Sequence, residues 1–326
     1  MKRNLKKISL LFVMMLILVG LAACANEASD KGEDIVEPPV QEETTGDVEI
    51  ADKFPLEIED AFGNVVVIEN APERIISLAP SHTEILYALD LGDKVVGVTA
   101  FCDYPEEALA VEKIGDFNGT NLEKIIELEP DLIVSYGEVS DEENSMFESA
   151  GIPVIAYMPE SMDEVIETIN QIAKATDVVE EGNTLTNNMI QKRDEIVAKV
   201  QDSQAVKAFY EVWHEPLMAA GSGSFVDGLI NLANGINIAS DAEGAYPNYD
   251  VEQLIENDPQ VYLTANMDSP DITVETISAR PGYDNITAVK NGDIYLLDGN
   301  IISRPGPRIV EGLELIARAL HPEAFE

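Results

Sequence analysis

The stretch that decides the fold is NLEKIIELEPDLIVSY, residues 121–136, because it recurs in the second half of the chain as DVEQLIENDPQVYLTA, residues 250–265. Each copy opens with apolar residues at helical spacing and closes, after a proline, with a short apolar run that indicates a strand. Aligned without gaps, the copies share four residues: Glu123 and Glu252, Ile126 and Ile255, Glu127 and Glu256, Pro130 and Pro259. A repeated helix–strand unit predicts two halves of similar plan.

A weaker repeat precedes each copy. SHTEILYALDLG, residues 81–92, matches SFVDGLINLANG, residues 224–235, in its serine, acid, leucine and glycine positions. Ser81 and Glu84 have the spacing of a capping box, so we expect Ser81 to begin a helix that Gly92 ends. Two repeats in the same order support an internal duplication.

Short apolar runs alternate with helical patterns around these repeats. The expected strands are IISL (75–78), VVGVT (95–99), DLIVSY (131–136), IPVIAY (152–157), AFYEVW (208–213) and VYLTA (261–265). Such alternation predicts α/β architecture with mostly parallel sheets. Residues 177–201 contain no proline and carry one apolar stripe, which predicts a long helix. We therefore expect two pseudo-symmetric α/β lobes, residues 54–176 and 204–326, joined by one rigid helix at 177–203.

A cleft between two lobes is a preferred ligand site, and ligands of open α/β sheets lie beyond the carboxyl ends of the strands. Aromatic residues stand at or near the ends of several expected strands: Tyr104, Trp213, and the pair Phe117 and Tyr246. The last two stand at equivalent positions, each four residues before a copy of the main repeat. Facing aromatic walls suit a bulky, flat or conjugated ligand.

The first 23 residues have the form of a secretory signal: a basic head, an apolar middle, and small residues at the end. The ending LAAC, residues 21–24, resembles the bacterial lipobox, in which the chain is cut before a cysteine that is then acylated. We expect Cys24 to become that lipid anchor, with residues 24–53 as an acidic flexible linker. Cys102 then has no partner, and we expect it to be a small, partly buried apolar residue; the alternative is a reactive thiol.

The formal charge of −41 excludes the cationic surface that nucleic-acid binding requires. Motifs of enzymes are missing too: the sequence contains no HExxH, no GxSxG, and no phosphate-binding loop with its lysine. We therefore expect neither an enzyme nor a catalytic cofactor or resident metal. The secretory signal and the expected cleft favour an extracytoplasmic, membrane-anchored binding protein, expected to be a monomer. The alternative is a surface adhesion or scaffold protein, which would not need the cleft.

Three segments carry a family resemblance: RIISLAPSHTEILYALDLGDKVVGVTAFCDYP (74–105), the repeat at 121–136, and SRPGPRIVEGLELIARALHP (303–322). They resemble the cobalamin and iron-siderophore class of periplasmic binding proteins. SLAPSHTE, DYP and RPGPR are most similar to its cobalamin-binding members. The resemblance implies two lobes on a rigid helix and delivery of the ligand to an ABC permease dimer with its ATPase.

The resemblance also implies roles for particular residues. Glu123 and Glu252 fall on the positions that dock on the permease. The ligand contacts fall on Ser81, Tyr104, Phe117, Tyr246 and Arg304, and Trp213 is a further candidate at the end of a strand. Phe117 and Tyr246 stand where cobalamin-binding members have tryptophans. The aromatic rings keep a stacking surface, but the departure from the pattern means that the ligand need not be a corrinoid.

Three ligand classes therefore stay open. A corrinoid is the ligand that the motifs imply. A ferric siderophore, an anionic chelate, would need cations, for which Arg280, Arg304 and Arg308 are candidates. A haem would need an axial ligand, for which Tyr104, His82 and His214 are candidates.

Overall fold

The structure is a computed structural model that describes residues 53–116, 119–266 and 272–326. Residues 50–326 form one compact unit. The expected signal peptide, Cys24, most of the linker and Phe117 lie outside the described residues. The proposed limits of the two lobes are residues 54–176 and 204–326.

The first lobe is built on a four-stranded, fully parallel sheet in the order β4-β3-β7-β8. An antiparallel hairpin, β1–β2, precedes it, and β5–β6 form a small separate ribbon. Its strands are β1 Leu56–Glu59, β2 Val65–Ile68, β3 Ile75–Ser77, β4 Val95–Val98, β5 Gly115–Asp116, β6 Gly119–Thr120, β7 Leu132–Tyr136 and β8 Val154–Tyr157. Its helices are α1 Pro80–Ala88, α2 Leu122–Glu127, α3 Asp141–Ala150 and α4 Met162–Ala175, with short 3₁₀ turns at Gly92–Lys94 and Glu106–Ala110.

The second lobe repeats this plan. Its sheet runs β10-β9-β12-β13, with β11 also paired to β9, and all pairs except β10–β9 are parallel. The strands are β9 Val206–His214, β10 Leu217–Ala219, β11 Gly235–Asn237, β12 Val261–Asn266 and β13 Ile294–Asp298. The helices are α6 Phe225–Leu232, α7 Val251–Asn257, α8 Val274–Ser278, α9 Thr287–Asn291, α10 Gly299–Ile302 and α11 Ile309–Leu320, with short 3₁₀ turns at Tyr283–Asn285 and Pro322–Phe325.

The structure confirms the expected α/β class with mostly parallel sheets. The two copies of the main repeat are the units α2–β7 and α7–β12, and each strand takes the third place in its sheet order. The shared residues therefore occupy equivalent positions in the two lobes.

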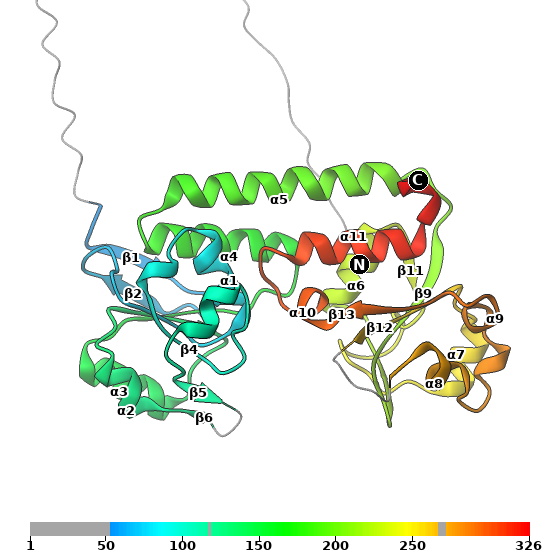
Figure 1. Cartoon of the computed structure of the whole chain (residues 1–326), viewed down its shortest axis with the longest axis horizontal. Coiled ribbons are helices and arrows are strands. Elements are labelled where there is room, and N and C mark those ends of the chain that lie inside the picture. Colours follow the sequence, from blue (N-terminus) through cyan, green and yellow to red (C-terminus); the bar gives the residue numbers. More distant parts are fainter. Residues whose placement is uncertain (1–52, 117–118, 267–271) are drawn as a thin grey trace, which may run out of the picture. The chain divides into compact units, whose positions relative to one another are not determined.

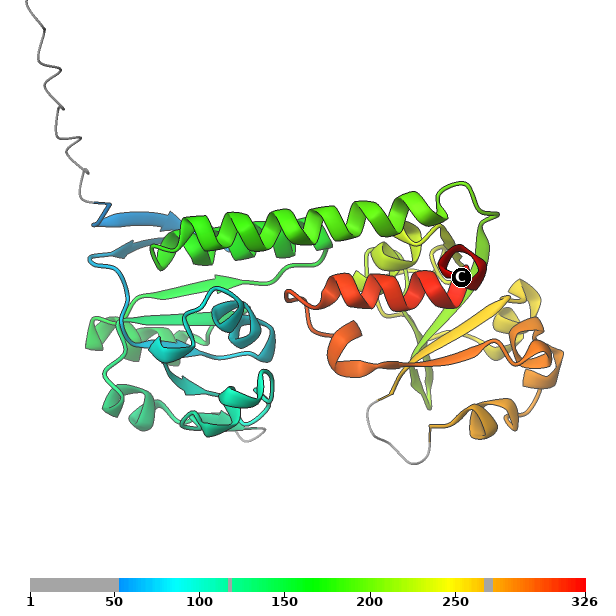
Figure 2. The ribbon, with the colours of Figure 1, turned by 45° about the horizontal axis from the view of Figure 1, so that its top comes forward.

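One long helix, α5 (Val179–Val200, 22 residues), runs along the same side of both lobes. It lies beside α4 of the first lobe and α11 of the second (Figures 1 and 2). Gly182 permits the closest approach, because a Cβ there would lie 2.4 Å from the Cβ of Ala173 in α4. Helix α4 itself has no counterpart among the sequence-based predictions.

The predicted capping box of α1 is wrong. The helix begins at Pro80 after Ala79, which provides no side-chain cap, and Ser81 and Glu84 are both buried inside it. The equivalent Ser224 does cap α6, since its Oγ accepts from the backbone N–H of Asp227 at 3.1 Å. Glu84 instead turns toward the second lobe, where charged partners compensate its burial.

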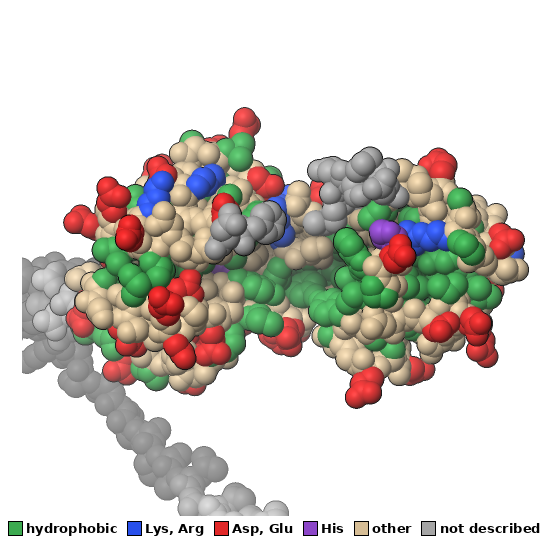
Figure 3. Space-filling view, turned by 90° about the horizontal axis from the view of Figure 1, so that it is seen from below, with side chains coloured by type: hydrophobic (Ala, Val, Ile, Leu, Met, Phe, Trp, Pro, Cys, Tyr) green, Lys and Arg blue, Asp and Glu red, His purple; other side chains and the backbone are tan. Residues whose placement is uncertain are grey.

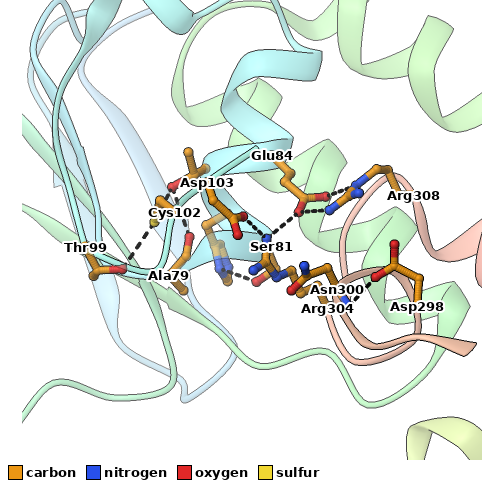
Figure 4. Close-up of polar contacts among 12 residues, drawn as sticks. Ala79, Ser81, Glu84, Thr99, Cys102, Asp103, Asp298, Asn300, Arg304 and Arg308 are labelled. Atoms are coloured by element: carbon orange, nitrogen blue, oxygen red, sulfur yellow. Dashed lines mark hydrogen bonds and ion pairs between the residues drawn. The ribbon is translucent and has the colours of Figure 1, made fainter. Parts of the chain in front are cut away.

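Those partners belong to the loop between α10 and α11. The Arg308 guanidinium donates to both carboxylate oxygens of Glu84, at 2.9 and 2.6 Å (Figure 4). Arg304 donates to Asp103 at 2.6 Å. The intervening Gly306 passes so close to α1 that a Cβ would lie 3.2 Å from the carbonyl oxygen of Ser81. These contacts join the lobes at a second place, away from α5.

We predict that Glu84→Ala lowers the free energy of unfolding by about 3–5 kcal/mol, because it leaves the partly buried Arg308 guanidinium without its carboxylate and removes one of the two carboxylates that Arg304 contacts. Urea unfolding followed by circular dichroism would measure this loss. Arg318→Ala is the control, since Arg318 lies at the surface, where it pairs with Glu314 one helical turn away and lies over the Phe325 ring, and its loss should cost about 1 kcal/mol or less. Equal losses in the two variants would contradict the role given to Glu84.

Candidate ligand-binding cleft

A cleft of about 470 Å³ lies between the lobes. Figure 3 looks toward it and shows hydrophobic side chains on both sides of the hollow, with many acidic side chains at the outer margins. The first lobe contributes Tyr136, Met158, Pro159 and Glu160, and the second contributes Tyr210, Val212, Trp213, Gly223, Phe225, Val226, Ala245, Tyr246, Ala265, Ile302, Ser303 and Pro305.

Most of these residues lie at or just after the carboxyl ends of parallel strands, where α/β sheets bind ligands. Tyr136 is the last residue of β7, Glu160 follows β8 by three residues, and Trp213 lies near the end of β9. The sheet topology therefore brings side chains that are far apart in the sequence to one place.

Three aromatic side chains dominate the walls. Tyr136, Trp213 and Tyr246 keep 40%, 54% and 53% of their surface exposed, which is unusual for large rings. The indole N–H of Trp213 donates to the backbone oxygen of Glu215 at 2.9 Å. Its one hydrogen-bond donor is thus used, and the ring offers a ligand only its faces and edges. These exposed ring faces allow a flat molecule to stack against the walls of the cleft.

Glu160 is the one charged residue among the described residues that line the cleft. Burial raises the pKa of the Tyr136 and Tyr246 phenols, and the nearby negative charge of Glu160 raises both further. The two phenols therefore stay protonated and neutral across the physiological range. Among the described lining residues, the wall is therefore aromatic and weakly negative and contains no cation.

The three candidate arginines are all paired within the protein. Arg304 binds Asp103, Arg308 binds Glu84, and Arg280 binds the buried Glu211. The hydrogen bond from Arg304 lowers the pKa of the Asp103 carboxyl, so that pair is ionised at neutral pH. Recruiting any of these guanidiniums to a ligand would break an ion pair that already exists.

The candidate histidines lie in different surroundings. His82 is completely buried, its Nδ1 lies 3.3 Å from the hydroxyl of Ser81, and desolvation lowers its pKa to about 3. It is therefore neutral and shielded. His214 is exposed at the end of β9, with its ring 5.7 Å from that of Trp213.

The structure brings together Trp213 and Tyr246 from the predicted ligand contacts. Ser81 is 3% exposed, beside the RPGPR loop, and Arg304 is held by Asp103 and Glu84. Tyr104 lines a second hollow of about 690 Å³, where the Arg308 guanidinium lies 3.8 Å from its ring centre.

Sequence reasoning missed Tyr136 and Glu160. Tyr136 could have been predicted from the sequence, because it is the last residue both of the first copy of the main repeat and of a strand. Glu160 carries no comparable signal, because its place in the cleft depends on how the loop after β8 turns into α4.

The predicted docking residues occupy matched positions. Glu123 and Glu252 are each the second residue of their helices, α2 and α7, and both are exposed. Both helices lie on the side of the molecule away from α5 (Figure 1). Neither carboxylate forms an ion pair with another described residue.

Residues 53–116, 119–266 and 272–326 contain neither a metal-binding cluster nor a membrane-spanning helix. No cluster there of three or more histidine, cysteine or acidic side chains is arranged to hold a metal ion. No helix in the same ranges combines the length and apolar character needed to cross a membrane.

Several known proteins are similar to this chain in both sequence and fold. The periplasmic binding protein family model matches residues 75–301. The uncharacterized ABC transporter substrate-binding lipoprotein YvrC of Bacillus subtilis is 31% identical over 98% of this chain and 99% of its own. The solved structure of the vitamin B12-binding protein BtuF of Vibrio cholerae matches with 28% identity and a TM-score of 0.66, over 78% of this chain and 99% of that one.

A possible iron-binding periplasmic protein of Staphylococcus epidermidis matches with 31% identity and a TM-score of 0.69, over 77% of this chain and all of that one. The matches span both lobes and the helix between them. The chain therefore belongs to the periplasmic binding protein family, as an ABC-transporter substrate-binding protein of the cobalamin and iron-siderophore class.

Proposed function

We propose that this protein is a lipid-anchored extracytoplasmic receptor that binds a corrinoid in the cleft between its lobes and delivers it to an ABC permease dimer with its ATPase. The observation that carries the choice of ligand is the chemistry of the cleft wall: exposed aromatic rings, one carboxylate, and no cation among the described lining residues.

A corrinoid fits such a wall. Its macrocycle is broad and flat, its rim carries neutral carboxamides, and its Co(III) centre contributes positive charge. Trp213 and Tyr246 can pack against the ring, while the phenols of Tyr136 and Tyr246 can exchange hydrogen bonds with the amides. The similarity to a vitamin B12-binding protein supports the same choice.

The alternative ligands fit less well. A ferric siderophore is often anionic, and haem carries two propionates, so both call for unpaired cations. Arg280, Arg304 and Arg308 are already bound to carboxylates. As an axial haem ligand, His82 would have to leave a fully buried position.

The docking proposal rests on the duplication. Glu123 and Glu252 are exposed at the same place in two equivalent helices, one per lobe. Two carboxylates held at a fixed separation match a symmetric permease dimer that offers one arginine cluster per subunit, because arginine binds carboxylate through paired hydrogen bonds. Such pairs orient a complex more than they strengthen it.

The lipid anchor is proposed from the LAAC ending at Cys24. A relative that is named a lipoprotein aligns over 98% of this chain, which supports the proposal. Residues 24–53 would then serve as the acidic tether between the membrane and the lobes.

We predict that the purified protein binds cyanocobalamin or cobinamide more tightly than haem or a ferric hydroxamate. Trp213→Ala should weaken corrinoid binding about 3- to 10-fold, the amount expected when a stacking ring is lost. Calorimetry and visible absorbance would measure both effects. Phe62→Ala is the control, because Phe62 is an exposed ring at the β1–β2 turn. Tight binding of the ferric chelate without corrinoid binding would overturn the corrinoid assignment.

We predict that the double variant Glu123→Ala with Glu252→Ala keeps its ligand affinity but loses transport, while each single variant loses part of it. The control is Glu127→Ala with Glu256→Ala, the other shared acidic pair of the same two helices, which should transport normally. Uptake by cells and ligand binding by the purified variants would be measured side by side. Normal uptake by the first double variant would end the docking hypothesis.

We predict that Cys24→Ala releases the protein from membranes or leaves the precursor uncut, since acylation and cleavage both depend on the thiol. Membrane fractionation with mass determination of the N-terminus would show which occurs. Membrane retention of a Cys24→Ala protein that is correctly cleaved would contradict the lipoprotein assignment.

A further inference from the structure

Glu160 holds an unusual place in the cleft. It is the one described lining residue with a formal charge, and it lies near phenols that come from both lobes, Tyr136 from the end of β7 and Tyr246 from the loop before α7. Its negative charge acts on both, since it contributes to the raised pKa of each phenol. An acidic side chain thus stands where the two walls of the cleft face one another.

The backbone of Glu160 is held in position. Its N–H donates to the carboxylate of Glu164 at 2.8 Å, and the N–H of Glu164 donates to the hydroxyl of Ser161 at 3.2 Å. Ser161 is the N-cap of α4, which packs along α5. The loop after β8 is therefore ordered by the helix that follows it. The side chain of Glu160 remains exposed and forms no ion pair with another described residue.

We propose that Glu160 is a specificity-determining residue: it accepts hydrogen bonds from amide or other N–H donors on the rim of the ligand and rejects ligands that present a carboxylate there. This inference rests on the proposed corrinoid function. The chemical class that it selects is a neutral or cationic corrinoid whose rim amides are intact, as opposed to one in which an amide has been hydrolysed to an acid.

The chemistry of the neighbouring groups supports this selection. A carboxylate takes hydrogen bonds but cannot donate them, so it pairs with the N–H of a carboxamide and repels a second carboxylate. The phenols of Tyr136 and Tyr246 are neutral and can either donate or accept hydrogen bonds, so they do not neutralise the charge of Glu160. Arg304, which stands in the sequence between the lining residues Ser303 and Pro305, is engaged by Asp103 and Glu84 and is not itself among the residues that line the cleft. A ligand carboxylate that contacts Glu160 would bring two like charges together in a cleft from which the bound ligand has displaced water, and their repulsion disfavours binding.

The high negative charge of the whole chain provides a competing explanation. A formal charge of −41 disfavours every anionic ligand to some extent, wherever it binds. At physiological salt this general effect is screened beyond about 8 Å, whereas a contact inside the cleft is screened much less. A matched variant distinguishes the effect of the overall charge from that of a local contact with Glu160. Glu167→Gln removes the same charge from the exposed face of α4, beside a different hollow.

The experiment compares cyanocobalamin with its individual monocarboxylic acids, each of which has one rim amide hydrolysed. Binding of each would be measured by calorimetry at physiological salt, with the full mature protein and with the variants Glu160→Gln, Glu160→Arg and Glu167→Gln. Thermal unfolding of each variant confirms that it is folded. The quantity of interest is the ratio of the dissociation constants for acid and amide.

We expect the unchanged protein to prefer cyanocobalamin over at least one acid by about 10-fold or more. Glu160→Gln should bring that ratio to within about threefold, Glu160→Arg should reverse it, and Glu167→Gln should leave it as it was. Corrinoid binding with the same ratio in Glu160→Gln as in Glu167→Gln would overturn the role of Glu160 and leave the corrinoid function intact. The absence of any corrinoid binding by the unchanged protein would overturn the proposed function and the selection by Glu160 together.

Discussion

The connection between the two lobes and the charge available in the cleft both depend on the contact between Glu84 and Arg308. A carboxylate that is 2% exposed is costly to bury, and here it is compensated by a guanidinium from the other lobe that donates to both of its oxygens. Arg304 and Asp103 extend the same cluster, and Gly306 lets the RPGPR loop approach the start of α1. Since α5 already spans both lobes, the cluster gives them a second point of attachment. Two attachments resist hinge motion better than one.

This attachment also shapes the chemistry of the cleft. The arginines that could have received an anionic ligand are used to hold the lobes together, and Arg280 is used inside the second lobe by Glu211. What remains on the described walls is a set of aromatic rings, neutral phenols and one carboxylate. The same ion pairs that connect the lobes therefore leave the described walls without an unpaired arginine, which is consistent with the proposed flat ligand with neutral or cationic groups.

The duplication made most of the fold predictable from the sequence. The helix–strand repeats and the proline-free stretch that became α5 are strong periodic signals, and the repeats placed Glu123 and Glu252 on helices that the structure contains. The expected strand at 208–213 likewise placed Trp213 in β9. The prediction was wrong where local and long-range interactions compete. Ser81 and Glu84 have the spacing of a capping box, yet Glu84 pairs with an arginine more than 200 positions away, which no local pattern reveals. Glu160 was not predicted for a related reason: only the path of the loop after β8 brings it near Tyr136 and Tyr246.

A crystal structure of the protein with cyanocobalamin would test the central claim most directly, namely that a rigid pair of lobes presents an aromatic cleft to a corrinoid. We expect the macrocycle to lie between the two walls, in contact with Trp213, Tyr136 and Tyr246, with the Glu84–Arg308 contact unchanged. A corrinoid bound instead in the hollow beside Tyr104, or bound by Arg304 and Arg308 after they have left their carboxylates, would contradict it.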